Sequence, residues 1–377
     1  MSKKNVLEFI TSMGEGGAQA LVKDYVLLID KTKFNIKILC LFPMLDSGPG
    51  QAVRNSKVAI SSVYPHYSKF WSLVNKFLGW WLVPRKLSAE LSTFHPDVIH
   101  AHLGVLKYLV LIRKKIPHLL YTCHSEPLKN FKSFSSKEFL SAKRLVAETG
   151  LKFIALHADM KAELDSLFDV DNTVVVHNGI DLQRFMKVDS TKVEIRQSLN
   201  IPEDAFVVGH VGRFMEAKNH EFIIKVFEEV KKRNSKALLL LIGSGPLKNK
   251  VKRVVENLGL ANSCIMLEGR NDIEYLLKTM DVFLFPSIYE GLPVSLIEAQ
   301  VAGLHCVSSS NVSQEAFLTP KLEVLSLDQP VNDWADTVLD LDYEGIYNRD
   351  ISIYDMKKEI KVLESLYEGS AYGPKRI

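Results

Sequence analysis

The chain has 377 residues, more than one hydrophobic core usually holds, so two domains of roughly 180 residues each are expected. Hydrophobic residues make up 47% and charged residues 24%, which is typical of a soluble globular protein. The net charge of +3 is too small to indicate nucleic-acid binding, and the four cysteines have no metal-ligand spacing. The opening apolar run, 6–10, is too short for a signal peptide, and no apolar stretch approaches the ~20 residues that span a bilayer. We therefore expect a cytoplasmic protein.

Short apolar runs alternate with helical patterns along the whole chain. In the first half they are 6–10, 35–41, 98–100, 119–123, 153–156 and 173–176. In the second half they are 205–211, 237–242, 264–267, 282–285 and 305–308. Helix-spaced apolar residues lie between them, for example in 221–232 and 247–258. Strands alternating with helices predict an α/β protein with two doubly wound, Rossmann-like domains facing across a cleft.

A polar interval, residues 187–204, separates the two halves and contains Pro202. We expect an N-terminal domain over 1–186, this interval as a linker, and a C-terminal domain over 205–350. Residues 351–377 are expected to form a final helix and tail, because 356–367 has helical periodicity.

In the first half, Gly16 and Gly17 follow the first predicted strand and lead into a helix. Glycines permit a tight turn and a close approach of the backbone to a ligand, but Gln19 breaks the dinucleotide fingerprint. His102 and His124 follow two other strands, where an imidazole can contact a sugar hydroxyl or a developing charge. An ordinary turn and structural histidines are the alternatives.

Basic and aromatic residues interleave at 69–71 and 76–86, and basic residues continue through 113–115 to Lys129 and Lys132. Tryptophan favours the membrane interface, and lysine and arginine favour anionic lipid, so peripheral binding to an anionic membrane is predicted. A solvated face over a partly aromatic core is the alternative. Single-stranded nucleic acid could use the same residues, but the phosphate-binding features of the second half disfavour it.

Two cations follow the first predicted strand of the second half. Arg213 and Lys218 would point from its carboxyl end, where a guanidinium and an ammonium can neutralise a diphosphate without a metal ion. Solvated surface cations are the alternative. Gly243 follows the next strand and forms either a turn beside a nucleotide or an ordinary turn.

Two glutamates follow the apolar run 282–285. Glu290 lies in the loop after it, and Pro293 suits the first turn of a helix that carries Glu298 about one turn on. Open α/β sheets bind ligands beyond the carboxyl edge of their strands. Two carboxylates can accept hydrogen bonds from several hydroxyls, and free N–H groups at a helix start favour phosphate. The combination indicates a nucleotide sugar, although two glutamates at this spacing also arise by chance.

Together these motifs resemble those of family 4 glycosyltransferases, and most of all those of bacterial exopolysaccharide and capsule clusters. The matching segments are Gly16-Gly17, Ile99-His-Ala-His102, His177-Asn-Gly-Ile-Asp181, Gly209-His-Val-Gly-Arg-Phe214 with Lys218-Asn-His220, Gly243-Ser-Gly-Pro246, and Glu290-Gly-Leu-Pro293 through Glu298. The resemblance implies the GT-B fold, with a final helix that crosses back to the first domain. It also implies a retaining, metal-independent hexosyltransferase that needs no cofactor.

The resemblance assigns roles to the candidate residues. Arg213 and Lys218 would hold the diphosphate of a donor that is expected to be a UDP-sugar. Glu290 would contact the sugar hydroxyls and Glu298 the ribose. Backbone N–H groups of Gly17 and Leu292 would support the phosphates, and Gly243 would line the donor site. His124 would lie near the anomeric carbon and the acceptor, and Glu290 and His124 are the expected catalytic residues.

The implied acceptor is an undecaprenyl-diphosphate-linked glycan at the inner face of the cell membrane. Asp169-Val-Asp171 and Asp340-Leu-Asp342 imitate the metal-binding motif of another glycosyltransferase class, but neither ends a strand, so no metal is expected. A nucleotide-sugar 2-epimerase of the same fold and a catalytically silent scaffold of a polysaccharide assembly complex are the alternatives.

Overall fold

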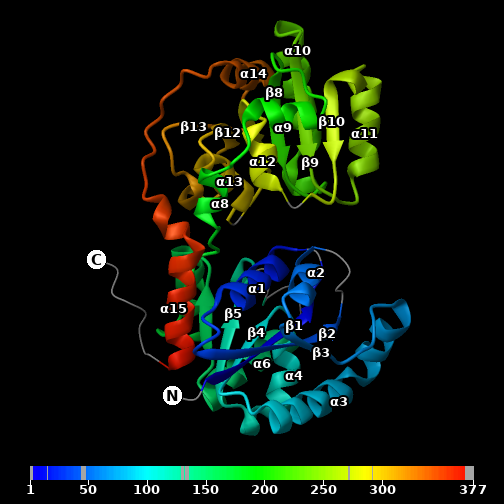
Figure 1. The fold of residues 1–377 in the computed structure, drawn as a ribbon. Helices are drawn as coiled ribbons and strands as arrows, with labels where there is room; N and C mark the ends of the chain where they lie inside the picture. Colours follow the sequence, from blue (N-terminus) through cyan, green and yellow to red (C-terminus); the bar gives the residue numbers. More distant parts are fainter. Residues whose placement is uncertain are drawn as a thin grey trace. The chain divides into compact units, whose positions relative to one another are not determined.

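The computed structural model describes residues 3–14, 16–43, 48–128, 131, 136–270, 272–290 and 292–369 (Figure 1). The chain divides into two compact units: Met1–Gly179 with Met356–Ile377, and Ile180–Asp355. Each contains one parallel sheet flanked by helices, which confirms the prediction of two doubly wound α/β domains. Lys129 and Lys132 lie outside the described residues.

The first unit has a seven-stranded sheet in the order β3-β2-β1-β4-β5-β6-β7. Its strands are β1 (Lys4–Ser12), β2 (Phe34–Phe42), β3 (Ala59–Ser62), β4 (Val98–His102), β5 (His118–Thr122), β6 (Lys152–Ala155) and β7 (Val174–Val175). Its helices are α1 (Gly17–Leu28), α2 (Gly48–Asn55), α3 (Lys69–Phe94), α4 (Leu106–Ile112), the 3-10 turn η1 (Arg113–Lys115), α6 (Ser136–Thr149), α7 (Ala158–Phe168) and α15 (Met356–Glu368).

The second unit has a six-stranded sheet in the order β10-β9-β8-β11-β12-β13. Its strands are β8 (Phe206–Val211), β9 (Ala237–Ile242), β10 (Cys264–Leu267), β11 (Val282–Phe285), β12 (His305–Ser309) and β13 (Leu322–Leu325). Its α-helices are α8 (Leu182–Met186), α9 (Lys192–Ser198), α10 (His220–Arg233), α11 (Lys248–Asn257), α12 (Ile273–Lys278), α13 (Val294–Val301) and α14 (Val331–Leu339). The 3-10 turns are η2 (Glu216–Lys218), η3 (Ala261–Ser263), η4 (Gln314–Ala316) and η5 (Ile351–Tyr354).

The order of strands reverses once in each sheet. In the first unit the reversal lies between β1 and β4, and in the second it lies between β8 and β11. The loops after these strands diverge to opposite faces of the sheet, and this is where doubly wound proteins bind their ligands. The fold therefore marks one candidate ligand-binding edge in each unit.

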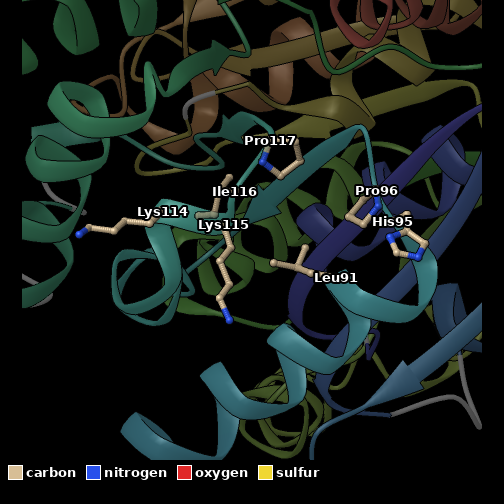
Figure 2. Close-up of a pocket in the computed structure, with 7 residues that line it drawn as sticks. All are labelled: Leu91, His95, Pro96, Lys114, Lys115, Ile116 and Pro117. Carbon is tan, nitrogen blue, oxygen red and sulfur yellow. The ribbon is translucent and has the colours of Figure 1, made fainter.

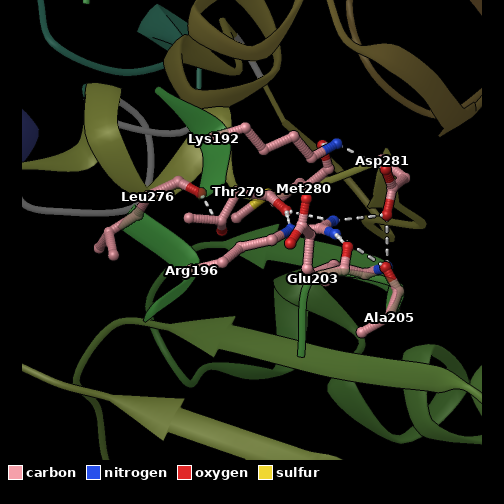
Figure 3. Close-up of polar contacts among 9 residues, drawn as sticks. Lys192, Arg196, Glu203, Ala205, Leu276, Thr279, Met280 and Asp281 are labelled. Carbon is pink, nitrogen blue, oxygen red and sulfur yellow. Dashed lines mark hydrogen bonds and ion pairs between the residues drawn. The ribbon is translucent and has the colours of Figure 1, made fainter. Parts of the chain in front are cut away.

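The interval 187–204, expected as a linker, lies in the second unit and contains α9. Arg196 is buried and donates to Asp281 at 2.8 Å, to the Thr279 carbonyl at 2.8 and 3.0 Å, and to two further carbonyls (Figure 3). Asp281 also accepts from Lys192 at 2.6 Å. A buried guanidinium is stable only when its donors are satisfied in this way. The polar residues of this interval thus fix α9 to the second sheet.

Candidate functional site

The strands of the second unit separate at their switch point. The ladder between β8 and β11 runs through Val208–Val282 and Gly209–Phe283. Beyond it, the ring of His210 stacks on Phe283 and Phe285, and its Nδ1 donates to the Leu284 carbonyl at 2.9 Å. The carboxyl ends of the two strands therefore diverge, and the loops that follow them hold the predicted donor-binding residues.

Lys218 and Glu290 form an ion pair across this switch point. Lys218 ends η2 after β8, Glu290 follows β11, and Nζ lies 2.6 Å from Oε1. Only 15% and 19% of the two side chains is exposed, and the ammonium lies 4.6 Å from the centre of the Phe285 ring. The Ile288 N–H donates to the Ala217 carbonyl at 2.8 Å, which ties the two loops together. The pair is close to solvent but partly shielded, so its charges interact strongly.

The loop that carries Arg213 is fixed by close backbone packing. A Cβ on Gly243 would lie 2.1 Å from the Gly212 carbonyl oxygen, so only glycine fits there. The Phe214 N–H donates to the Ser244 carbonyl at 2.8 Å, and the Phe214 carbonyl accepts from Leu247 at 3.0 Å. The Arg213 side chain is exposed beside this rigid turn. A turn of this kind can present backbone N–H groups and one cation to a ligand.

Leu292 and Glu298 lie before and within helix α13. It begins at Val294, so Pro293 is its N-cap residue rather than part of its first turn, and in the part of the chain that the structure describes no side chain caps it. Leu292 directly precedes this uncapped start. Glu298 lies one turn into the helix, as the sequence predicts, and is half-buried. Burial lowers the pKa of Arg184 on α8, but two carboxylates oppose burial and the net pKa is raised. The larger effect comes from Glu274, 2.6 Å away, and a smaller one from Glu298.

In the first unit, His102 and His124 belong to a buried hydrogen-bonded cluster at the carboxyl edge of the sheet. His102 Nε2 lies 2.7 Å from Glu8 Oε2 on β1, and its Nδ1 lies 3.0 Å from His124 Nε2. The Tyr367 hydroxyl, on α15, donates to Glu8 Oε1 at 2.6 Å. His100 Nδ1 lies 2.7 Å from the same hydroxyl. The cluster thus connects the first strand, two later strands and the last helix.

The electrostatics of this cluster set its protonation states. Burial alone would raise the pKa of the Glu8 carboxyl, but His100 and His102 hold it well below its usual range. Burial and the neighbouring His100 lower the pKa of His102 to about 4, against the opposing effect of Glu8. Burial, His102 and His100 also hold the pKa of His124 well below its ordinary value. At neutral pH, His102 and His124 are therefore neutral and Glu8 is ionised.

The glycines Gly16 and Gly17 lie at the same edge of the sheet. Gly16 is the N-cap residue of α1 and Gly17 is its first residue, and no side chain of the described residues caps the helix. A Cβ on Gly17 would meet no atom within 4 Å, whereas one on Gly16 would lie 2.3 Å from Gln19 Oε1. The first N–H groups of α1 are therefore available to an anion.

Glu8, His100 and His102 also carry ligand atoms within 4.8 Å of one another, a spacing that a metal ion can use. Their hydrogen bonds already use these atoms: Glu8 Oε2 pairs with His102 Nε2, and His100 Nδ1 pairs with the Tyr367 hydroxyl. The donor set fits a hydrogen-bonded relay better than a metal centre.

Sequence reasoning did not single out Glu8 or Tyr367. A carboxylate in the middle of the apolar run 6–10 is costly unless it is paired, and this signal could have identified Glu8. Tyr367 lies in a helical pattern near the end of the chain, where a buried tyrosine looks like any other core residue.

Comparison with known proteins agrees with this architecture. Residues 16–184 match the family described as glycosyltransferase family 4, and residues 191–340 match glycosyl transferases group 1. HepE of Anabaena, solved in complex with UDP and glucose, superposes with a TM-score of 0.68 at 17% identity, covering 96% of this chain and 95% of that one. The protein is therefore a glycosyltransferase with the GT-B fold. Its first half matches family 4 and its second half matches group 1 of these enzymes, which agrees with the resemblance of its motifs.

Two curated relatives share most of its length. EpsF of Bacillus subtilis, named as a glycosyltransferase, is 28% identical over 89% of this chain and 87% of its own length. A UDP-Gal:alpha-D-GlcNAc-diphosphoundecaprenol alpha-1,3-galactosyltransferase of Escherichia coli is 25% identical over 72% of this chain and 75% of its own length.

Proposed function

We propose that the protein transfers a hexose from a UDP-sugar to a lipid-diphosphate-linked glycan, with retention at the anomeric carbon, during synthesis of a bacterial surface polysaccharide. The observation that carries the proposal is the Lys218–Glu290 pair across the switch point of the second sheet. An ammonium and a carboxylate 2.6 Å apart provide one group for a diphosphate and one for sugar hydroxyls. The names of the Escherichia coli relative and of the Anabaena complex support a UDP-sugar and a lipid-linked acceptor.

The chemistry follows from where charge develops. The bond between the anomeric carbon and the β-phosphate oxygen breaks, so negative charge grows on the departing UDP while the sugar becomes oxocarbenium-like. Lys218 and Arg213, with the uncapped N–H groups of α13, would stabilise the leaving diphosphate. The acceptor hydroxyl attacks the sugar on the face from which UDP departs, and it passes its proton to the leaving phosphate. Attack on this face retains the configuration of the anomeric carbon. This route needs no side-chain nucleophile and no metal.

The remaining roles are assigned by chemistry. Glu290 would orient the sugar hydroxyls and Glu298 would accept from the ribose. Gly17 would offer its N–H to a phosphate at the start of α1. His124, half-buried and neutral, would contact the reacting sugar or the acceptor through its Nδ1, since its Nε2 is paired with His102.

A lipid-linked acceptor requires a membrane, and α3 offers a surface for it. This helix of 26 residues exposes large apolar side chains at helical spacing: Phe70, Leu73, Phe77, Trp80 and Trp81. Lys69, Lys76 and Arg85 lie on the same helix, and one end of α3 projects from the rest of the first unit (Figure 1). Aromatic residues flanked by cations are typical of helices that lie in a membrane interface. None of the described helices is long and apolar enough to cross a bilayer.

A basic hollow lies at the other end of α3. It has a volume of about 330 Å³ and is lined by Leu91, His95, Pro96, Lys114, Lys115, Ile116 and Pro117. Figure 2 shows Lys115 on one side of Leu91 and His95 on the other. A lysine such as Lys115 beside the apolar side chain of Leu91 suits the phosphate of an anionic lipid headgroup. This hollow supports the proposal that the protein acts at the cytoplasmic face of the membrane.

The transfer reaction is tested with labelled UDP-sugars and a lipid-diphosphate acceptor. Transfer with retention supports the proposal, epimerised donor identifies an epimerase, and binding without turnover identifies a scaffold. Arg213→Ala should lower kcat/KM for the UDP-sugar by about 10- to 100-fold, because a charge-assisted bond is worth about 1.5–3 kcal/mol.

Membrane binding is tested by flotation with anionic and neutral liposomes at increasing salt. Replacing Trp80 and Trp81 with serine, or Lys114 and Lys115 with serine, should reduce binding to anionic liposomes without changing UDP affinity. Each basic residue near an anionic surface contributes about 1 kcal/mol, which salt screens. Lys250→Ser with Lys252→Ser, on α11 of the other unit, is the matched control. Equal binding of the wild type to neutral and anionic liposomes at low salt would exclude this membrane surface.

A further inference from the structure

The hydrogen bonds from α15 to His124 form one continuous chain. Tyr367 donates to one carboxylate oxygen of Glu8, and the other oxygen lies 2.7 Å from His102 Nε2. His102 Nδ1 then lies 3.0 Å from His124 Nε2. Glu8, His102 and Tyr367 are fully or almost fully buried, so none of them can contact a ligand directly. Any influence they have on chemistry must pass through His124.

The direction of every bond in this chain follows from Glu8. An ionised carboxylate only accepts, so His102 must donate from Nε2 and Tyr367 from its hydroxyl. A neutral imidazole that donates from Nε2 has a bare Nδ1, which must accept from His124. His124 therefore carries its proton on Nε2, and its Nδ1 is left as an acceptor. The low pKa of His102, about 4, excludes the alternative in which His102 is an imidazolium at neutral pH.

The hydrogen bonds of His100 are also fixed in direction by Glu8. With its proton committed to Glu8, the Tyr367 hydroxyl accepts from His100 Nδ1 at 2.7 Å. His100 Nε2 is then bare and accepts from the Thr122 hydroxyl at 2.7 Å. All five hydrogen bonds are satisfied by one proton arrangement, and this arrangement requires Glu8 to be ionised.

We propose that Glu8 and Tyr367 are positioning residues that hold His124 in the Nε2–H tautomer, so that its Nδ1 accepts a hydrogen bond from a hydroxyl of the sugar or the acceptor. The role in transfer depends on the proposed function, whereas the tautomer is a property of the first unit alone. The hydrogen bond between Tyr367 and Glu8 also gives α15 a function, because Tyr367 orients the carboxylate that sets the direction of the hydrogen bonds to His124.

The test reads the tautomer of His124 directly. In protein labelled with ¹⁵N-histidine, long-range ¹H–¹⁵N spectra distinguish protonated from bare ring nitrogens, and His124→Gln identifies the His124 signals by their loss. Glu8→Gln is the decisive variant. Its amide can donate to His102 Nε2, which moves the His102 proton to Nδ1 and forces His124 to carry its proton on Nδ1.

Tyr367→Phe and Tyr25→Phe form a matched pair. The Tyr25 ring stacks on His100 with 5.8 Å between ring centres, but its buried hydroxyl has no hydrogen-bond partner among the described residues. Each variant therefore removes one buried hydroxyl from the same cluster, and only the Tyr367 hydroxyl belongs to the chain. We expect Tyr367→Phe to shift the His124 signals and to lower kcat by about fivefold or more. A fivefold fall corresponds to a rise of about 1 kcal/mol in the activation free energy. Tyr25→Phe should change neither.

The possible outcomes test the His124 tautomer and its role in sugar transfer separately. A bare Nδ1 on wild-type His124, a reversed tautomer in Glu8→Gln and a fall in kcat with little change in KM would support the proposal. A proton on Nδ1 in the wild type would overturn it, and so would a reversed tautomer without loss of turnover. If Glu8→Gln does not fold, the wild-type spectrum and the Tyr367→Phe and Tyr25→Phe variants still test the proposal. If the wild type transfers no sugar, the proposed function fails, while the spectra still test the relay.

Discussion

The ion pair between Lys218 and Glu290 leads to a prediction that distinguishes the two residues. In the free protein the ammonium already has a partner 2.6 Å away, and the two side chains are 15% and 19% exposed. A diphosphate that binds Lys218 must share it with Glu290 and also lies near the negative charge of that carboxylate. Glu290 therefore opposes UDP binding even though the sugar needs it.

The magnitudes follow from the geometry. Lys218→Met removes a charge-assisted bond worth about 1.5–3 kcal/mol and should weaken UDP binding about 10- to 100-fold. Glu290→Gln removes a like charge from the phosphate site. At about 6 Å and an effective dielectric constant of about 20 this repulsion is ~3 kcal/mol before screening by salt. We expect at least ~1 kcal/mol to remain, so UDP should bind about fivefold or more tightly while turnover falls.

Calorimetric titration with UDP, at fixed ionic strength and beside kcat measurements, provides the assay. Lys236→Met and Asp204→Asn are matched controls, because these residues form an exposed ion pair before β8 and β9, at the opposite edge of the same sheet. Both should leave UDP affinity unchanged. If Glu290→Gln weakened UDP binding as much as Lys218→Met, the two residues would not compete, and the division of the donor between them would be refuted.

Glu298→Ala should weaken UDP binding about tenfold or more, whereas Glu290→Ala should lower turnover without weakening UDP binding; loss of UDP binding only in Glu290→Ala would reverse the two roles. Transfer should persist in EDTA, since side-chain cations and helix N–H groups supply the positive potential; a complete loss restored by Mn²⁺ or Mg²⁺ would contradict this. Acid should destabilise the protein, because the pKa values of His102 and His220 are lowered to about 4 and both protonate more readily when unfolded. Each histidine contributes up to ~3 kcal/mol at neutral pH that is lost between about pH 6.5 and 4, and a denaturant midpoint unchanged over that range would contradict this prediction.

The central strands were predictable because parallel strands buried on both faces are apolar along their whole length. The expected runs 237–242 and 282–285 coincide with the central strands β9 and β11. The two strands that no prediction included, β3 and β13, are both edge strands. The β3 sequence Ala59–Ser62 is only partly buried and half polar, so no apolar run marks it. A strand with one neighbour needs less apolar surface than a central strand.

The long helix α3 was not predicted either, although its residues were singled out for membrane binding. Its sequence is apolar on more than one face and contains Gly79 and Pro84, which obscure the helical period. The reason for this pattern is that one face is buried in the core of the first unit through Val83 and Leu87, while another carries exposed aromatic residues. A helix that has two apolar faces has no clear amphipathic signal.

The two switch points also differ in how far the sequence could reveal them. The second-unit site consists of short motifs directly after strands, so Lys218 and Glu290 could be assigned from local sequence. The relay of the first unit joins residues 8, 102 and 367, and only the folded chain shows that they meet. Burial then separates their behaviour. The Lys218–Glu290 pair is partly exposed and can exchange partners with a ligand, so its variants should change affinity with little effect on folding. Glu8 is fully buried and can act only through His124, so its variants must change a tautomer, and the stability of the first unit, before they change a rate.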